Sequence, residues 1–175
     1  MSDRAQPPLS ETVRVRRVDY ADAGDGAALL RLLDAYARDP MGGGAPLPDD
    51  VGERLCRDLS RNPAAVSFIA WRDGSGTPEA IGLINCFDGY STFRARPLLN
   101  VHDIVVLPEY RGRGIGQALL AAAEDEARRR GCCKLTLEIL TGNRRAMASY
   151  LRFGFEPYSL DPRAGQASFM HKWLA

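Results

Sequence analysis

Apolar and polar residues follow two periods along this chain, and the order of those periods predicts the order of its elements. Alternation at every second residue is typical of half-buried strands, whereas apolar residues three and four apart are typical of helices. The first half of the chain is predicted to contain a strand at residues 13–18, helices at about 22–39 and 49–61, and two hairpin strands at 66–71 and 80–87. Either Asp22 or Asp25 can cap the first helix.

The second half begins with a longer apolar run at residues 98–107. The run breaks at Pro108, and a helix-forming segment follows Gly116. Further patterns predict a strand at 134–140, a helix that starts near Asn143, and strands at 156–160 and 167–174. This order predicts an α/β fold in which a mixed sheet carries helices on both faces.

Length and composition narrow the class of protein. With 175 residues, 45% of them hydrophobic, the chain suits one domain, so we expect a flexible tail at residues 1–10 and a single domain at residues 11–175. A net charge of +1 gives no basic surface for nucleic acid. No apolar run approaches the ~18 residues of a membrane span, and the N-terminus lacks a signal-peptide core. We therefore expect a cytoplasmic protein without a membrane or nucleic-acid partner.

The four cysteines are Cys56, Cys86, Cys132 and Cys133. Their spacing matches no zinc-binding pattern, and the adjacent pair is poorly placed for a mutual disulfide. We expect free thiols and no metal site.

The most informative stretch joins the strand that ends near Val106 to the next helix. Gly112, Gly114 and Gly116 lie two residues apart there. Such a loop can direct several backbone N–H groups at an anion, which the dipole of the following helix also favours. The spacing differs from the P-loop, which needs Lys and Ser or Thr after its last glycine, and from the dinucleotide fingerprint Gly-x-Gly-x-x-Gly.

The loop resembles the coenzyme A loop of the GNAT superfamily of acyl-CoA-dependent N-acyltransferases. That family's pattern is Arg or Gln, two residues, Gly, one residue, and Gly or Ala. Arg111, Gly114 and Gly116 occupy those positions here, and the Val106-x-Pro108 lead-in also matches.

A second stretch resembles the family's other signature. Asn143 follows a predicted strand, Ala146 comes three residues later, Tyr150 lies on the next helix, and Gly154-Phe155 leads out of it. The two signatures occur in the family's order and start about 30 residues apart, at Arg111 and Asn143. Two such matches in this order rarely arise by chance.

The resemblance implies the GNAT fold, a mostly antiparallel sheet that splays between its fourth and fifth strands, with acetyl-CoA as cosubstrate. In the family the pantetheine arm enters this gap and bonds to the fourth strand. Family members often form dimers, so a homodimer stays open. The implied cosubstrate site comprises Ile104, Val105, Val106, Arg111, Gly112, Arg113, Gly114, Ile115, Gly116, Asn143 and Tyr150.

Acetyl transfer to an amine needs a neutral amine and a proton for the leaving thiolate. By resemblance, Tyr150 is the general acid. The base is less determined: Asp103 on the fourth strand is the first candidate, followed by Glu138 and then His102. Each of the three could instead be a structural hydrogen-bonding residue.

In the family, two segments shape the acceptor pocket, and they correspond here to residues 39–48 and 88–97. The second segment combines Tyr90 and Phe93 with two arginines, so these aromatics are candidate substrate-binding residues. The alternative is an ordinary solvated loop.

The favoured function is an N-acetyltransferase that moves an acetyl group from acetyl-CoA to a primary amine of a small molecule, by direct attack in a ternary complex. A protein lysine or N-terminal acetyltransferase is one alternative, and a non-catalytic coenzyme A-binding module is another. The lack of an extra domain favours the first over the second, and the presence of Tyr150 and Asn143 argues against the third.

Overall fold

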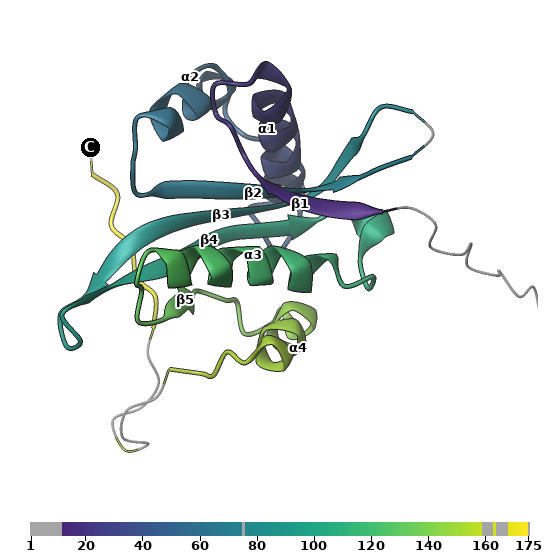
Figure 1. Ribbon diagram of the computed structural model, residues 1–175. Helices are drawn as coiled ribbons and strands as arrows, with labels where there is room; N and C mark the ends of the chain where they lie inside the picture. Colours follow the sequence, from purple (N-terminus) through teal and green to yellow (C-terminus); the bar gives the residue numbers. More distant parts are fainter. Residues whose placement is uncertain (1–11, 75, 159–162, 164–167, 175) are drawn as a thin grey trace, which may run out of the picture.

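The computed structural model describes residues 12–74, 76–158, 163 and 168–174. Within these residues, five strands form one sheet in the order β1-β2-β3-β4-β5 (Figure 1). The strands are β1 Val13–Arg17, β2 Ala65–Arg72, β3 Glu79–Ser91, β4 Arg96–Val106 and β5 Leu135–Leu137. Neighbouring strands are antiparallel except for β4 and β5, which are parallel.

Helices cover both faces of the sheet. They are α1 Ala23–Arg38, α2 Asp49–Ser60, the short 3-10 helix η1 Pro108–Tyr110, α3 Ile115–Arg129 and α4 Arg144–Phe153. In Figure 1, α1 and α2 lie on one face and α3 and α4 on the other. None of the helices in the described part of the chain is both long and apolar enough to cross a membrane. The predicted α/β fold with a mixed sheet is confirmed.

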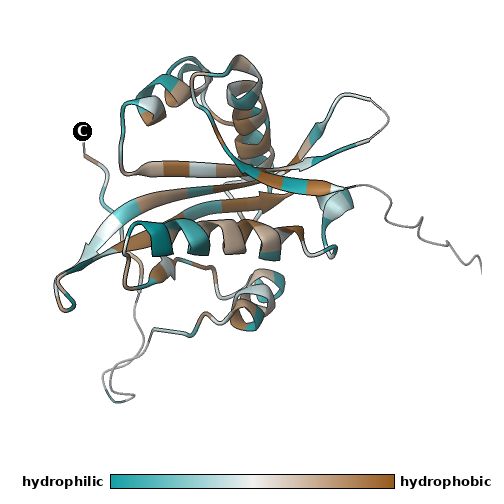
Figure 2. Cartoon of the chain, viewed as in Figure 1, coloured by the Kyte–Doolittle hydropathy of each residue, from teal (hydrophilic) through white to brown (hydrophobic). Residues whose placement is uncertain are grey.

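The core lies where β3 meets the helices on its two faces. Leu83 and Ile84, consecutive residues of β3, have no exposed surface, so both faces of this strand are covered. Leu29 and Leu32 of α1 and Leu119 of α3 are equally buried. Figure 2 shows that the first half of α3 is apolar and its last turns hydrophilic. The apolar start of α3 therefore packs on the sheet close to the glycine loop.

Helix α1 begins where its capping residue predicts. The Asp22 carboxylate accepts a hydrogen bond from the N–H of Asp25 at 2.8 Å, which makes Asp22 the N-cap. Asp25 is itself buried and accepts from the Arg16 guanidinium at 2.8 Å and from the N–H of Asp19 at 2.9 Å. Of the two candidates, Asp22 caps the helix and Asp25 joins it to β1.

A β-bulge interrupts β4 at His102. Asn85 of β3 pairs with Asp103, whereas the next residue, Cys86, pairs with Val101, so His102 is an extra residue in β4. Pairing with β5 stops at the same place, because Val101 is the last residue of β4 that β5 contacts in register. Beyond the bulge β4 separates from β5, and the predicted splay between the fourth and fifth strands is confirmed.

Strand β5 is shorter than the sequence pattern predicts. The pattern covers residues 134–140, but only Leu135–Leu137 pair with β4. The apolar run continues past the point where β4 diverges, so its later residues have no partner strand. Glu138 consequently follows the strand instead of lying within it.

The two strands predicted at the C-terminal end are wrong for the described residues. Residues 156–158 and 168–174 have no regular secondary structure. Phe169 and Trp173, the alternating apolar positions, are 76% and 87% exposed. Alternation forms a strand only beside a partner strand. The rest of these two stretches, and the predicted tail at residues 1–10, lie outside the described residues, so the predicted domain limits stay a prediction.

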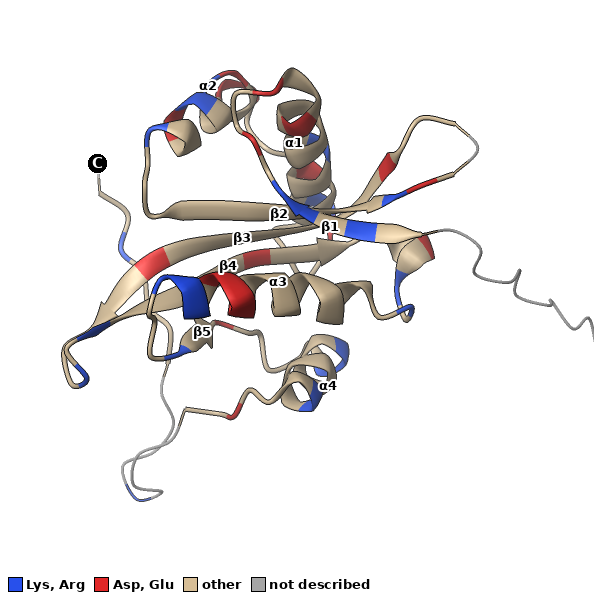
Figure 3. Ribbon diagram, in the orientation of Figure 1, with Lys and Arg blue, Asp and Glu red and all other residues tan. Residues whose placement is uncertain are grey.

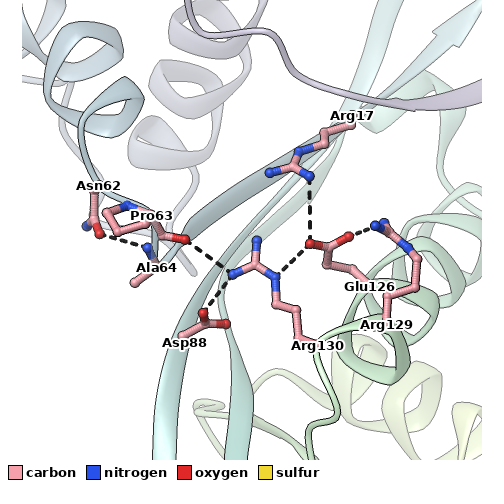
Figure 4. Close-up of polar contacts among 8 residues, drawn as sticks. All are labelled: Arg17, Asn62, Pro63, Ala64, Asp88, Glu126, Arg129 and Arg130. Atoms are coloured by element: carbon pink, nitrogen blue, oxygen red, sulfur yellow. Dashed lines mark hydrogen bonds and ion pairs between the residues drawn. The ribbon is translucent and has the colours of Figure 1, made fainter.

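A buried carboxylate ties α3 to the sheet (Figure 4). Glu126 is 2% exposed and forms ion pairs with Arg17 of β1, with Arg129, and with Arg130 at 2.6 Å. Arg130 also contacts Asp88 of β3 at 2.7 Å. A buried charge is tolerated when it is paired and hydrogen-bonded. This cluster therefore holds the C-terminal half of α3 in place.

Candidate active site

The free edge of β4 forms one wall of the site. Leu107 donates its N–H to the carbonyl of Ile81 on β3 at 3.0 Å. N–H groups of consecutive strand residues point to opposite sides, so Val106 and Ile104 direct theirs away from β3. That side is the one from which β5 has diverged. The edge thus presents backbone groups without a partner strand in the described part of the chain.

The glycine loop connects this edge to α3. Gly112 and Gly114 have φ values of 83° and 81°, in the left-handed region that favours glycine. Gly114 is the N-cap of α3, no described side chain caps this helix, and its first turn carries no acidic residue. A Cβ added at Gly116 would meet no atom within 4 Å. The first turn of α3, from Gly114 to Gln117, lines a cavity, as an anion site at a helix N-terminus requires.

Tyr110 fixes the loop to the sheet. It is 9% exposed, and its hydroxyl donates to the Glu79 carboxylate at 2.8 Å. The guanidinium groups of Arg72 and Arg113 lie 5.2 and 5.6 Å from its ring centre. Arg113 thus packs on Tyr110.

Arg111 joins the loop to the segment after α1. Its Nε donates to the carbonyl of Val106 at 2.9 Å, and its NH2 pairs with the Asp39 carboxylate at 2.9 Å. The N–H of Met41 and the Arg111 guanidinium lower the pKa of Asp39. The Arg111 side chain therefore holds the end of β4 and the post-α1 segment together.

These elements enclose a cavity of about 410 Å³, within the usual size range of small-molecule sites. The lining also includes Tyr36 of α1 and, after it, Asp39 and Met41. The predicted cosubstrate residues that line the cavity are Ile104, Val105, Val106, Arg111, Gly112, Gly114, Ile115, Gly116, Asn143 and Tyr150. Arg113 is not among the lining residues.

Helix α4 is held against α3 by side-chain hydrogen bonds. Asn143 caps α4, accepting from the N–H of Ala146 at 3.1 Å. Gln117 of α3 donates to the hydroxyl and the carbonyl of Ser149, at 2.9 and 3.0 Å. Ser149 precedes Tyr150, so these contacts help to hold the backbone that carries Tyr150.

Tyr150 lies between the packed interior and the cavity. Its ring meets Phe155 edge-on, with ring centres 5.9 Å apart, and it also lines the cavity. Burial, and then the nearby Tyr36, raise the pKa of Tyr150 to about 12. The phenol therefore keeps its proton at neutral pH and can donate it.

The first two of the three candidate bases, Asp103 and Glu138, have different surroundings. Asp103 is half-buried and accepts from Asn85 Nδ2 at 3.0 Å. Glu138 is exposed and accepts from Asn100 Nδ2 at 3.3 Å. Neither is among the lining residues. Asp103 directly precedes Ile104, which lines the cavity. Burial, and then the Asp103 charge, raise the pKa of Tyr36, another lining residue. The assignment of the base to either residue stays a prediction.

The predicted substrate aromatics lie away from the cavity. Tyr90 is on β3 and Phe93 in the turn that follows, and they are 63% and 95% exposed. Tyr90 pairs with Pro97 at the start of β4, whereas the cavity adjoins Val106 at its end. Figure 1 shows the β3–β4 hairpin and η1 at opposite ends of the sheet. Substrate binding by these two residues stays a prediction.

Several lining residues were not predicted from the sequence. Arg145 and Arg152 of α4 line the cavity, as do Gln117 and Ser149. Figure 3 shows basic but no acidic positions on α4. An Arg145 guanidinium nitrogen lies 3.9 Å from the position of a Cβ built on Gly112. No spacing pattern marks these residues, because the packing of α4 on α3 brings them to the site.

Comparisons with known proteins agree with this geometry. A family model described as "Acetyltransferase (GNAT) family" matches residues 29–155. Streptothricin acetyltransferase of Streptomyces lavendulae is 44% identical over 63 residues, which are 36% of this chain and 33% of that protein. Thialysine N-epsilon-acetyltransferase of Bos taurus is 43% identical over 54 residues, which are 31% of this chain and 32% of that protein. The chain thus spans about a third of the length of these curated relatives.

Solved structures share the fold. The aminoglycoside N-acetyltransferase AAC(6')-Iy in complex with CoA superposes with a TM-score of 0.74 at 20% identity, covering 95% of this chain and 99% of that one. A probable acetyltransferase superposes with a TM-score of 0.75 at 16% identity, covering 93% and 99%. The family model spans most of the described fold, including β4, the glycine loop and α4. This chain therefore belongs to the acetyltransferase (GNAT) family.

Proposed function

We propose that this chain transfers the acetyl group of acetyl-CoA to a primary amine of a small molecule, by direct attack of the amine in a ternary complex. One observation carries the proposal: the uncapped N-terminus of α3, the free edge of β4 and the Tyr150 phenol all line one cavity. A phosphorylated thioester cosubstrate needs three kinds of group along its length: an anion site, a row of backbone hydrogen-bonding groups and a proton donor.

The diphosphate of the cosubstrate binds at the first turn of α3. The N–H groups of Ile115, Gly116 and Gln117 and the helix dipole supply the attraction, and Arg145 adds a positive charge beside Gly112. The pantetheine arm runs along β4, where the backbone groups of Ile104 and Val106 meet its amides. The thioester then lies next to Tyr150, which protonates the leaving thiolate.

The acceptor amine enters beside the segment after α1. Tyr36, Asp39 and Met41 line that side of the cavity, and the last two belong to the segment predicted to shape the acceptor pocket. Streptothricin acetyltransferase and thialysine N-epsilon-acetyltransferase, by their names, act on small molecules, as does the AAC(6')-Iy enzyme. Their similarity supports a small amine as acceptor.

Calorimetry with acetyl-CoA and CoA, followed by a thiol-release assay against a panel of amines, tests the proposal. We expect binding of both nucleotides and release of thiol with at least one small amine. Labelling of peptides without turnover of small amines would instead indicate a protein acetyltransferase. Binding without thiol release from any acceptor would indicate a non-catalytic module.

A further inference from the structure

A row of polar side chains crosses the buried part of the sheet and ends at Asp103. Ser67 of β2 pairs with Asn85 of β3, and Asn85 pairs with Asp103 of β4. Residues paired across neighbouring strands project from the same face, so the three side chains stand side by side. Ser67 and Asn85 are 2% and 4% exposed. Buried polar groups are destabilising unless they are hydrogen-bonded, so this row needs its internal bonds.

The hydrogen bonds in the row all run in one direction. Asn85 donates its Nδ2 to Asp103 Oδ2 at 3.0 Å, since a carboxylate only accepts. Asn85 Oδ1 consequently accepts from the Ser67 hydroxyl at 2.6 Å. That bond uses the single serine proton, so the Tyr20 hydroxyl, 2.8 Å from Ser67 Oγ, is the donor at the far end. A chain of three donors thus terminates on one oxygen of Asp103.

The bulge at His102 decides the face of the sheet from which Asp103 projects. Asp103 pairs with Asn85 and Val101 pairs with the next residue of β3, so Asp103 and Val101 project from opposite faces. Without the extra residue they would share a face. Asp103 directly precedes Ile104, and Ile104, Tyr36 and Tyr150 all line the cavity. The Asp103 charge also contributes to the raised pKa of Tyr36. The row of hydrogen bonds therefore ends one residue before the stretch of β4 that lines the cavity.

Building on the function proposed above, we propose that Tyr20, Ser67 and Asn85 are positioning residues that hold the Asp103 carboxylate as the base for the acceptor amine. Asn85 fixes Oδ2, while Oδ1 has no hydrogen-bond partner among the described residues. The acceptor ammonium gives one proton to Oδ1, and the neutral amine attacks the thioester carbonyl carbon. The C–S bond breaks as Tyr150 protonates the sulfur. A second proton from the nitrogen restores Tyr150, and the first leaves through Asp103.

Three titratable groups near Asp103 or Tyr36, namely Cys86, Tyr36 and Asp39, keep their charge over about pH 7 to 9, the range of the test. Burial raises the pKa of the Cys86 thiol to about 12 and also raises the pKa of Tyr36. A backbone N–H and an arginine partner lower the pKa of Asp39. His102, the neighbour on the same strand, is exposed and meets the ring of Phe87 with ring centres 5.5 Å apart. The variant His102→Gln therefore tests the contribution of this side chain separately.

The experiment compares kcat/KM for the amine at about pH 7 and pH 9 in full-length variants. At about pH 7 we expect Asp103→Asn to lower kcat/KM for the amine roughly 10²-fold. We expect Asn85→Leu to lower the same quantity roughly 10-fold. Both deficits shrink at the higher pH, because more of an amine with a pKa near 10 is then already neutral. Asn85→Leu adds no loss to Asp103→Asn, since both act through one carboxylate. Ser60→Ala, which deletes a serine hydroxyl bonded to the carbonyl of Arg57, is the control and keeps full activity.

Coenzyme A affinity, measured by calorimetry, stays unchanged in every variant. If Asn85→Leu does not fold, Tyr20→Phe replaces it in the same kcat/KM comparison, because this variant removes only the terminal hydrogen-bond donor of the row and keeps the ring. Two results would overturn the positioning role and leave the proposed function standing. One is a loss of kcat/KM that is equal at both pH values. The other is a pH-dependent loss that appears in His102→Gln and not in Asp103→Asn. Absence of thiol release by the unmodified protein with every amine overturns this role together with the proposed function.

Discussion

Tyr150, the proposed proton donor, lies where the cavity meets the packed interior. Its ring packs on Phe155, and its hydroxyl is the one group that a substitution by phenylalanine removes. We expect Tyr150→Phe to lower kcat about 10²-fold or more, because the thiolate then leaves without its acid. Coenzyme A affinity by calorimetry serves as the control and changes little. Undiminished turnover at saturating substrates would remove Tyr150 from the mechanism.

The raised pKa of Tyr150 also predicts a pH dependence. The folded protein holds this proton to a pH of about 12, whereas an unfolded tyrosine loses it near pH 10. Between these values the unfolded state binds fewer protons, so this group's contribution to folding stability is lost as the pH rises through that window. We expect kcat at saturation to show no alkaline decline below about pH 10. A decline near pH 8, with circular dichroism unchanged, would contradict the role of a buried phenol.

Gly116 tests the position of the cosubstrate with a single carbon atom. A Cβ at this position meets nothing within 4 Å in the described chain, and alanine is a better helix former than glycine. We expect Gly116→Ala to keep or raise the melting temperature while weakening coenzyme A binding about 10-fold or more, since the methyl group occupies the approach to the N–H groups. Gly52→Ala on α2, where a Cβ also meets nothing, is the matched control. Equal affinity in both variants would place the nucleotide elsewhere.

At the scale of elements, α4 depends on α3 for its position. None of the residues of α4 is fully buried. Its N-cap at Asn143 and the Gln117 bonds to Ser149 therefore contribute much of what holds it. A helix of 10 residues is marginal by itself. The position of Tyr150 thus rests on these hydrogen bonds together with the apolar contacts of Tyr150 and Phe153 with the core.

This dependence predicts the effect of removing the Gln117 amide. We expect Gln117→Ala and Gln117→Glu to lower kcat roughly 10-fold, because both remove the donor to Ser149 and a small displacement of a catalytic group is costly. Amide hydrogen exchange across residues 144–153 should become faster in both variants while exchange in β3 stays slow. Wild-type exchange and turnover in Gln117→Glu, which keeps the side-chain length, would show that the amide donor is dispensable.

For the whole molecule, the Glu126 cluster joins α3 to β1 and β3. Replacing Glu126 with Gln leaves Arg17, Arg129 and Arg130 around a neutral group. Removing one partner of a buried ion pair costs about 3 to 5 kcal/mol, so urea denaturation should show a loss of that order. Glu124→Gln on the same helix, which breaks the exposed pair with Arg128, should change stability by less than about 1 kcal/mol. Equal effects would mean that the buried pair contributes no more than the surface pair.

The coupling between elements explains which sequence predictions failed. Periodicity correctly located α1, α2, the β2–β3 hairpin and α3, because each shows its own hydrophobic period and is bounded in the sequence by glycine, proline or turn residues. It overestimated β5 and the C-terminal strands, since a strand also needs a neighbour, and the bulge at His102 takes that neighbour away from β5. A bulge leaves no signal in the alternation of a run as apolar as residues 98–107.

The amino-acid sequence by itself determined the order of most elements, the glycine loop and the placement of Asn143 and Tyr150 on one helix, because these depend on local propensity and short spacing. Only the tertiary structure decided that Arg145 and Gln117 line the cavity, that Tyr90 and Phe93 lie at the far end of the sheet, and that Ser67 and Asn85 support Asp103. Those relations depend on strand register and on how helices pack across the sheet. Contacts between residues far apart in the chain set both of these.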